Sequence, residues 1–249
     1  MIPQFIFLLG IISVQAMFRP MYYGGGKEDC DCPDESTSSP VSSTSTQKPE
    51  TQTIRYSYTC PGSDWHLFTR GENHWCVKFF PSETHISINN ASEICKQAES
   101  ELTGLENDEE RKSILDEAKN HISSLNQPSG AVALAGSRTQ KCQTTNSAVL
   151  QAAPCNDPTK VYVLPASAAT NPDFMWKNWA DKEPSFSQWS NGEYENCLQL
   201  FINPSDSKLN GKINDFYCAR NVAPNDDTDT KYWNFGALCG READMEGVI

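Results

Sequence analysis

Trp189-Ser-Asn-Gly-Glu193-Tyr-Glu195-Asn-Cys197 and, further on, Gly211-Lys-Ile213-Asn214-Asp215-Phe-Tyr-Cys218 are the two pieces of sequence that decide the fold. In each piece, carboxylate or carboxamide side chains stand just before a cysteine. A Cys197–Cys218 bridge would therefore hold Glu195, Asn214 and Asp215 close together. Hard oxygen ligands held in this way suit Ca²⁺. The alternative is that these polar side chains only satisfy backbone groups in a loop-rich fold.

The N-terminus indicates a secreted protein. Residues 1–16 read as a signal peptide, because a short apolar run from Phe5 precedes the small residues that end at Ala16. The chain has 10 cysteines, and disulfides persist in oxidising compartments. No later stretch is apolar enough to span a membrane. The formal net charge of -12 argues against nucleic acid or an anionic membrane as partner, since both would be repelled.

Residues 17–59 are expected to form a disordered stalk. The tract from Ser36 to Pro49 is rich in Ser, Thr and Pro and cannot bury enough apolar surface to offset its ordering entropy. In a secreted protein such a tract is either an O-glycosylated stalk or an unmodified linker. Cys30 and Cys32 lie outside the expected domain, so they favour a local disulfide or a disulfide-linked dimer.

A hairpin and two helices are expected next. Trp65–Phe68 pairs with Trp75–Phe79, with Cys60 and Cys76 available to staple the hairpin. Apolar residues at helical spacing predict a helix over Ile88–Ala98 with Ser87 or Asn89 as its cap. A second helix starts at Asn107 with acidic residues in its first turn. Asn90 begins an N-glycosylation sequon.

The rest of the chain alternates strands with long polar loops. Residues 131–136 predict a buried strand, and residues 233–238 predict a last strand that ends at Cys239. Residues 137–175 are expected to be irregular, with Cys142 and Cys155 close enough in sequence to bridge each other. Residues 219–231 form another polar loop, and residues 242–249 read as a short acidic tail.

Over residues 60–241 this order of elements resembles a C-type lectin-like domain, in particular its secreted invertebrate members. Ala133-Leu-Ala-Gly136 stands where the family has Trp-Ile-Gly-Leu, and Trp179-Ala-Asp181-Lys-Glu-Pro184 resembles its Trp-x-Asp-Gly-Ser-Pro segment. The resemblance implies an α+β fold in which two helices flank small antiparallel sheets below a long loop region. It also implies four disulfides: Cys60–Cys76, Cys95–Cys239, Cys197–Cys218 and, within the insertion, Cys142–Cys155.

Sugar-binding members of this family hold Ca²⁺ with a Glu-Pro-Asn triplet, a Glu before the first inner cysteine and an Asn-Asp pair before the second. Glu183-Pro184-Ser185 looks like the triplet, but Trp179–Pro184 fits the segment upstream of it better. On that register the triplet falls on Glu193-Tyr194-Glu195. The resemblance therefore implies Glu193, Glu195, Asn214 and Asp215 as ligands of a degenerate Ca²⁺ site and of sugar hydroxyls.

No catalytic constellation is present in the sequence. The four histidines form no His-Glu-x-x-His motif, and there is no Gly-x-Ser-x-Gly elbow or phosphate loop. We therefore expect a binding protein and not an enzyme. By family analogy its partner is a glycan or glycoprotein on a microbe or in host matrix, with a role in innate immunity. The alternative is a Ca²⁺-independent protein-interaction module that uses the 137–175 and 219–231 loops.

Overall fold

The computed structural model describes residues 55–165, 171–221 and 228–248. The expected signal peptide, most of the stalk, and Cys30 and Cys32 lie outside the described residues, so the proposed dimer linkage remains a prediction. Within the described part of the chain, no helix has the length and hydropathy that crossing a bilayer requires.

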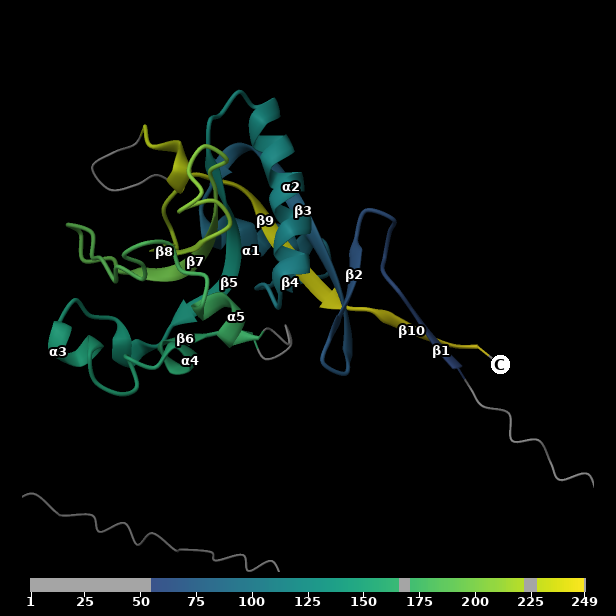
Figure 1. The fold of residues 1–249 in the computed structure, drawn as a ribbon, viewed down its shortest axis with the longest axis horizontal. Helices are drawn as coiled ribbons and strands as arrows, with labels where there is room; N and C mark the ends of the chain where they lie inside the picture. Colours follow the sequence, from purple (N-terminus) through teal and green to yellow (C-terminus); the bar gives the residue numbers. More distant parts are fainter. Residues whose placement is uncertain (1–54, 166–170, 222–227, 249) are drawn as a thin grey trace, which may run out of the picture. The chain divides into compact units, whose positions relative to one another are not determined.

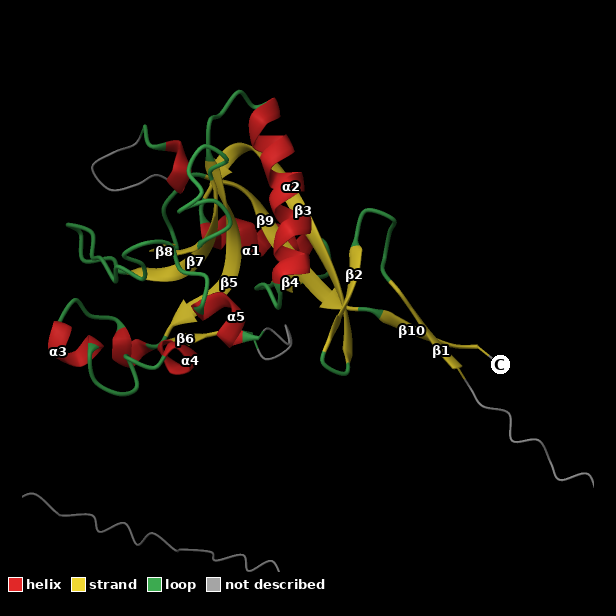
Figure 2. Ribbon diagram, in the orientation of Figure 1, coloured by secondary structure: helices red, strands yellow, loops and turns green. Residues whose placement is uncertain are grey.

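One mixed sheet carries the domain (Figure 2). Its strand order is β2-β3-β9-β5-β7-β8, and β4 and β6 pair with β9 and β5 respectively. The contact between β5 and β9 is parallel, and every other pairing in this sheet is antiparallel. The α+β class implied by the resemblance is confirmed, although one eight-stranded sheet replaces the expected small sheets. The bounds are β2 (His66–Arg70), β3 (Asn73–Ile86), β4 (Glu101–Leu102), β5 (Gly130–Arg138), β6 (Tyr162–Val163), β7 (Glu195–Ile202), β8 (Ile213–Tyr217) and β9 (Asn234–Glu242).

Two helices form where the sequence predicts them. Helix α1 covers Ile88–Gln97, and the Ser87 hydroxyl caps it by accepting a hydrogen bond from the Asn90 N–H. Helix α2 covers Asp108–Ser124, and the Asn107 side chain accepts bonds from the N–H groups of its first turn. Asn90 is exposed in the first turn of α1, and its glycosylation stays a prediction.

The two helices pack on opposite faces of the sheet. Successive residues of a strand point to opposite faces. In β5, Val132 and Leu134 belong to the core cluster that contains Ile114 and Ala118 of α2. Ala133, between them, belongs to the cluster around α1. The face toward α1 therefore carries small residues in β5 and β9, Ala133 and Ala237, and the aromatic residues Phe216 and Tyr217 in β8.

Four disulfides join the elements as the resemblance implied. They are Cys60–Cys76, Cys95–Cys239, Cys142–Cys155 and Cys197–Cys218. The Cys95–Cys239 bridge links α1 to β9 across 144 residues of sequence. A loop of that length gives a crosslink its largest effect on the entropy of the unfolded chain.

The ends of the described chain form a two-stranded ribbon (Figure 1). Strand β1 (Arg55–Thr59) pairs antiparallel with β10 (Asp244–Val248). The sequence indicates a stalk and an acidic tail for these segments. The alternating Arg-Tyr-Ser-Tyr-Thr of β1 is favourable in a strand, and β10 supplies the partner that no local pattern could reveal.

The insertion between β5 and β7 is more regular than expected. Its short helices are η1 (Gln140–Cys142), α3 (Ser147–Leu150), α4 (Pro158–Val161) and α5 (Pro172–Trp176). Strand β6 pairs with the end of β5, which brings Val161 and Tyr162 into the core. The expectation of an irregular loop was wrong for these residues, because the insertion adds its own apolar side chains to the main core. The 219–231 loop is described only at its ends, where Thr230–Tyr232 forms η3.

A buried ion pair fixes the start of α2 against β2. Both side chains of Arg70 and Glu110 are fully buried, and the guanidinium donates to both carboxylate oxygens at 2.9 and 2.7 Å. Arg70 also donates to the Thr103 hydroxyl at 3.1 Å and the Gly104 carbonyl at 3.0 Å. The charge of each partner is therefore met inside the protein, which a buried pair requires.

Candidate functional site

Strands β7 and β8 carry the first part of the candidate site. They pair antiparallel, and Cys197–Cys218 crosslinks the segments that contain them. Glu195 is 8% exposed and Asp215 is fully buried. The structure therefore brings these two predicted carboxylates together inside the protein. Asn214 precedes Asp215 in β8, is also buried, and has a side-chain N–H without a hydrogen-bond partner.

The loop of residues 183–187 closes over these carboxylates. The backbone N–H groups of Ser185 and Phe186 donate to the two oxygens of Asp215 at 3.0 and 2.9 Å. Oε2 of Glu195 accepts the Ser187 N–H at 2.9 Å and the Ser185 hydroxyl at 2.6 Å. The Glu183–Pro184 peptide bond in this loop is cis. The loop is thus held to the strands by the same oxygens that the sequence suggested as metal ligands.

Glu183 is the third carboxylate, and Glu193 is not part of the group. Burial and the neighbouring charge of Asp215 raise the pKa of Glu183 to about 8. Glu193 instead forms an ion pair with Arg220 at 3.0 Å and accepts a bond from the Ala219 N–H. The sequence favoured Glu193 over Glu183, whereas in the structure loop 183–187 reaches the strands and Glu193 turns to Arg220, so a ligand role for Glu193 stays a prediction. Glu183, Glu195 and Asp215 are called the carboxylate cluster below.

The pKa values in the carboxylate cluster reflect its burial. Burial, followed by the charge of Asp215, raises the pKa of Glu195 to about 7. Burial also raises the pKa of Asp215, although its hydrogen bonds oppose that change. One oxygen of Glu183, Oε2, is buried and accepts no hydrogen bond. The cluster therefore retains protons that exposed carboxyl groups would lose, and Oε2 of Glu183 is covered by the protein.

Tyr162 of the insertion and Arg138 at the end of β5 complete the surroundings of the cluster. The Tyr162 hydroxyl donates to Oδ2 of Asp215 at 3.2 Å, and its pKa is raised well above the usual value by burial and by that charge. Arg138, opposite Tyr162 in the β5–β6 pairing, is 2% exposed and packs its guanidinium 4.3 Å from the centre of the Phe186 ring. It donates to the Thr144 carbonyl, while Nε and Nη1 have no partner.

Arg138 supplies positive charge to the cluster. Burial lowers its pKa, whereas the charges of Asp215 and Glu195 act in the opposite direction. Sequence reasoning missed both Arg138 and Tyr162. Two features of the sequence could have indicated them: an arginine at the end of an apolar strand, and a Cys142–Cys155 pair able to fold the insertion back.

The cluster does not fit a resident Ca²⁺ as it stands. Carboxylate and hydroxyl oxygens are suitable donors for this ion. However, both oxygens of Asp215 and Oε2 of Glu195 already accept hydrogen bonds from the loop. Among the described residues, no group of three or more His, Cys, Asp or Glu side chains is arranged to hold a metal ion. The donors are present, but they do not form a coordination shell.

The helices, the disulfide order and the loop over β7 and β8 define a C-type lectin-like domain. A sequence profile of the C-type lectin domain-containing protein 141/158 family matches residues 68–242. The chain belongs to this family. C-type lectin domain-containing protein 158 of Caenorhabditis elegans is 35% identical over 167 residues, which is 67% of this chain and 78% of that protein. Protein 141 of the same organism is 33% identical over 68% of this chain and 59% of its own length.

Solved structures with a similar chain path share little sequence with this protein. A calcium-independent type II antifreeze protein is 15% identical, with a TM-score of 0.43, and covers 76% of this chain and 98% of its own. The carbohydrate-recognition domain of cow CD23, solved with a GlcNAc2Man3 oligosaccharide, is 17% identical with the same TM-score and covers 76% and 99%.

Proposed function

We propose that this chain is a carbohydrate-binding protein that uses the outer surface of loop 183–187 and needs no resident Ca²⁺. Its membership in a C-type lectin family supports carbohydrate as the ligand class. Fold alone does not determine function, so the proposal depends on the chemistry of this loop.

Loop 183–187 presents polar groups suited to sugar hydroxyls. The side chains of Ser185 and Ser187 are exposed, and that of Glu183 is half-buried. The Ser185 hydroxyl donates to Glu195 and its oxygen can still accept, whereas the Ser187 hydroxyl can both donate and accept. Neighbouring sugar hydroxyls offer the same combination of donor and acceptor. Such a ligand can therefore satisfy several of these groups at once.

The proposal rests on one observation: the buried carboxylates hold loop 183–187 in place. The N–H groups of residues 185, 186 and 187 donate to the buried carboxylates of Asp215 and Glu195. A loop that is already ordered loses little conformational entropy when a ligand binds. The carboxylate oxygens thus position the loop and have no need of a metal ion to do so.

Arg138 takes part in the same arrangement as an internal counter-charge. A group of buried carboxylates is unstable unless protons, cations or N–H donors compensate for it. Here the backbone supplies donors, Tyr162 supplies a hydroxyl, and Arg138 supplies a positive charge from the end of β5. We expect Tyr162 and Arg138 to position the loop without touching the ligand.

Arg138 and Tyr162 support this proposal, whereas a protein interface on the exposed part of the 137–175 loop stays the alternative. Both Arg138 and Tyr162 face inward and are buried. We further infer that the protein is secreted, since the N-terminal signal pattern and four disulfides both suit an oxidising compartment. A glycan on a microbe or in the surrounding matrix is then an accessible partner.

Glycan-array binding by the full mature chain, in Ca²⁺ and in EDTA, tests this proposal. We expect the same glycans to bind equally under both conditions. Ser185→Ala and Glu183→Gln should each weaken binding about fivefold or more, the loss of about one hydrogen bond. Glu193→Gln is the matched control, because it makes the same Glu-to-Gln replacement at a residue outside the loop, paired with Arg220.

Two results would contradict the proposal. Loss of all binding in EDTA would show that a metal ion is required. Binding that is insensitive to Ser185→Ala and Glu183→Gln would place the ligand elsewhere on the domain.

A further inference from the structure

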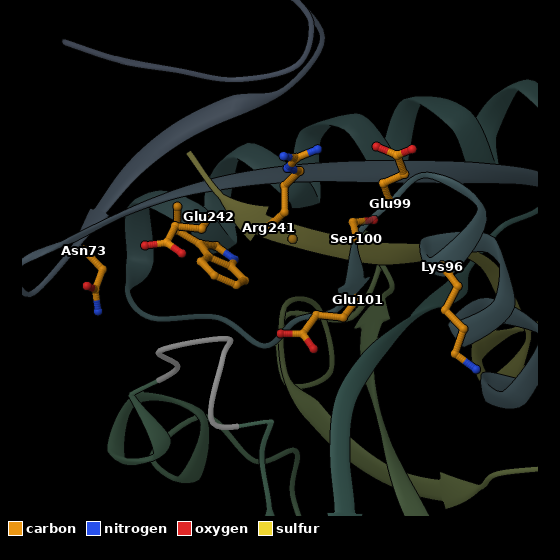
Figure 3. Close-up of a pocket in the computed structure, with 9 residues that line it drawn as sticks. Asn73, Lys96, Glu99, Ser100, Glu101, Arg241 and Glu242 are labelled. Atoms are coloured by element: carbon orange, nitrogen blue, oxygen red, sulfur yellow. The ribbon is translucent and has the colours of Figure 1, made fainter. Parts of the chain in front are cut away.

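A second candidate ligand site lies between the turn after α1 and the ends of β3 and β9 (Figure 3). It is an open pocket of 480 Å³, and none of the carboxylate-cluster residues lines it. Pockets of roughly 300–1,000 Å³ are the usual size for small-molecule sites. This pocket is therefore large enough to take one or two sugar rings.

The floor of the pocket is rigid. Trp75 lines it and is only 4% exposed. The guanidinium of Arg70 lies 5.6 Å from the centre of the Trp75 ring and is itself held by the buried pair with Glu110. A Cβ at Gly240 would overlap Nε1 of Trp75, so only glycine leaves the indole in this position.

The walls of the pocket are joined directly to each other. Glu101 of β4 pairs with Gly240 of β9, and the Cys95–Cys239 disulfide links the residues that precede Lys96 and Gly240. A pocket crosslinked in this way does not need to be ordered when a ligand enters. The Trp75 N–H is buried against Gly240, so a ligand in the pocket does not contact this group.

The charge around the pocket is predominantly negative. Glu99, Glu101 and Glu242 line it, together with Lys96 and Arg241. The two basic residues, however, bind acids outside the lining. Lys96 bonds Glu93 at 2.6 Å, and Arg241 bonds Asp244 at 3.4 Å.

Figure 3 places two of the three carboxylates on one side of the pocket and Glu99 on the side of Lys96. The carboxylates of Glu101 and Glu242 extend toward the side where Asn73 lies, whereas the Lys96 ammonium extends the opposite way. A cationic group on that side would meet carboxylates and the amide of Asn73 above an aromatic floor.

We propose that this pocket binds an amino sugar through its free ammonium group. The ammonium donates charge-assisted hydrogen bonds to the carboxylates, and such bonds are about twice as strong as neutral ones. The sugar ring lies toward Trp75, and its hydroxyls meet Asn73 and Ser100, which also line the pocket. This site is separate from loop 183–187, so the test of either site leaves the other undecided.

Titration of the ¹⁵N-labelled mature chain with glucosamine tests the proposal. The six tryptophans give countable indole signals, and Trp75→Phe assigns the one that matters. At about pH 6 the amine is protonated. We expect the Trp75 indole signal to shift and to saturate in the millimolar range. N-acetylglucosamine, which lacks the charge, should be at least about tenfold weaker, the effect of about 1.4 kcal/mol.

Conservative variants locate the binding. Glu242→Gln should weaken glucosamine binding about fivefold, because it removes one charge from the side where the ammonium lies, whereas Glu99→Gln, on the side of Lys96, should leave binding unchanged. Both side chains are exposed, so neither change should affect folding. Glu72→Gln is the matched control, since Glu72 is an exposed acid in the turn before Asn73 and is not in the lining.

Four results would overturn the proposal. The first is no shift of the Trp75 signal at about 50 mM glucosamine, far above a millimolar dissociation constant. The second is equal binding of N-acetylglucosamine, and the third is unchanged binding by Glu242→Gln. The fourth is tighter binding of a blocked lysine than of glucosamine, which would assign the pocket to a peptide side chain.

Discussion

Stability should fall as the pH rises through the neutral range, because of the carboxylate cluster. The pKa of Glu195 is 4.5 in the unfolded chain and about 7 in the folded protein, where burial and the charge of Asp215 raise it. Below pH 4.5 this carboxyl is protonated in both states. Between 4.5 and about 7 the unfolded chain loses the proton and the folded protein keeps it. The stabilisation is therefore fully present below the unfolded pKa and is lost as the pH rises through the folded pKa.

The size of the effect follows from the same two values. The two pKa values of Glu195 differ by about 2.5, and one pKa unit is worth 1.36 kcal/mol, so the difference corresponds to about 3 kcal/mol. For a domain of this size, about 3 kcal/mol lowers the Tm by roughly 6–10 °C. The raised pKa of Glu183, about 8, acts in the same direction up to higher pH. The carboxylate of Glu183 is partly exposed and screened by water, so the size of the stability change is taken from Glu195 alone.

Calorimetric melting at pH 5, 6, 7 and 8, at constant ionic strength, measures this effect. We expect the highest Tm at pH 5 and a decrease toward pH 8. Glu195→Gln keeps an oxygen that can accept from Ser185 and Ser187 but cannot titrate, so it should flatten the decrease. Glu193→Gln is the control, because Glu193 lies outside the cluster.

Two observations would refute the reasoning behind this prediction. The first is a Tm that stays constant or rises between pH 5 and pH 8. The second is a Glu195→Gln variant that keeps the full decrease, since the titrating group would then lie elsewhere.

Three further predictions follow from the fold. Glu110→Gln should destabilise the domain by about 3–5 kcal/mol in urea unfolding, because it leaves the buried charge of Arg70 without its partner; a loss under 1 kcal/mol would contradict this. Replacing Cys95 and Cys239 with alanine should cost about 5 kcal/mol, given the separation of 144 residues, and a change in Tm of only a degree or two would disprove it. Ca²⁺ at about 5 mM should leave the Tm unchanged, whereas a site with a dissociation constant of about 1 mM would add about 1 kcal/mol to the stability. Arg138→Met removes the positive charge beside the carboxylates, so Ca²⁺ should raise the Tm of this variant.

Local patterns were sufficient for the helices. Ser87 and Asn107 cap α1 and α2 where polar residues precede apolar residues at helical spacing. A helix cap and its first turn lie within four residues of each other, so one window of sequence contains the whole signal. The hairpin of β2 and β3 was found for the same reason, although β3 runs on to Ile86 because β9 pairs with it beyond the hairpin.

The sequence by itself determined the fold class, the two helices and which residues stand beside Cys197 and Cys218. Only the tertiary structure decided that Glu183 joins Glu195 and Asp215, and that Glu193 turns to Arg220. Each of these pairs is separated by loops whose path depends on pairing between distant strands. The sequence shows which residues have the right chemistry, whereas the contacts that raise a pKa or occupy an oxygen exist only after the chain has closed.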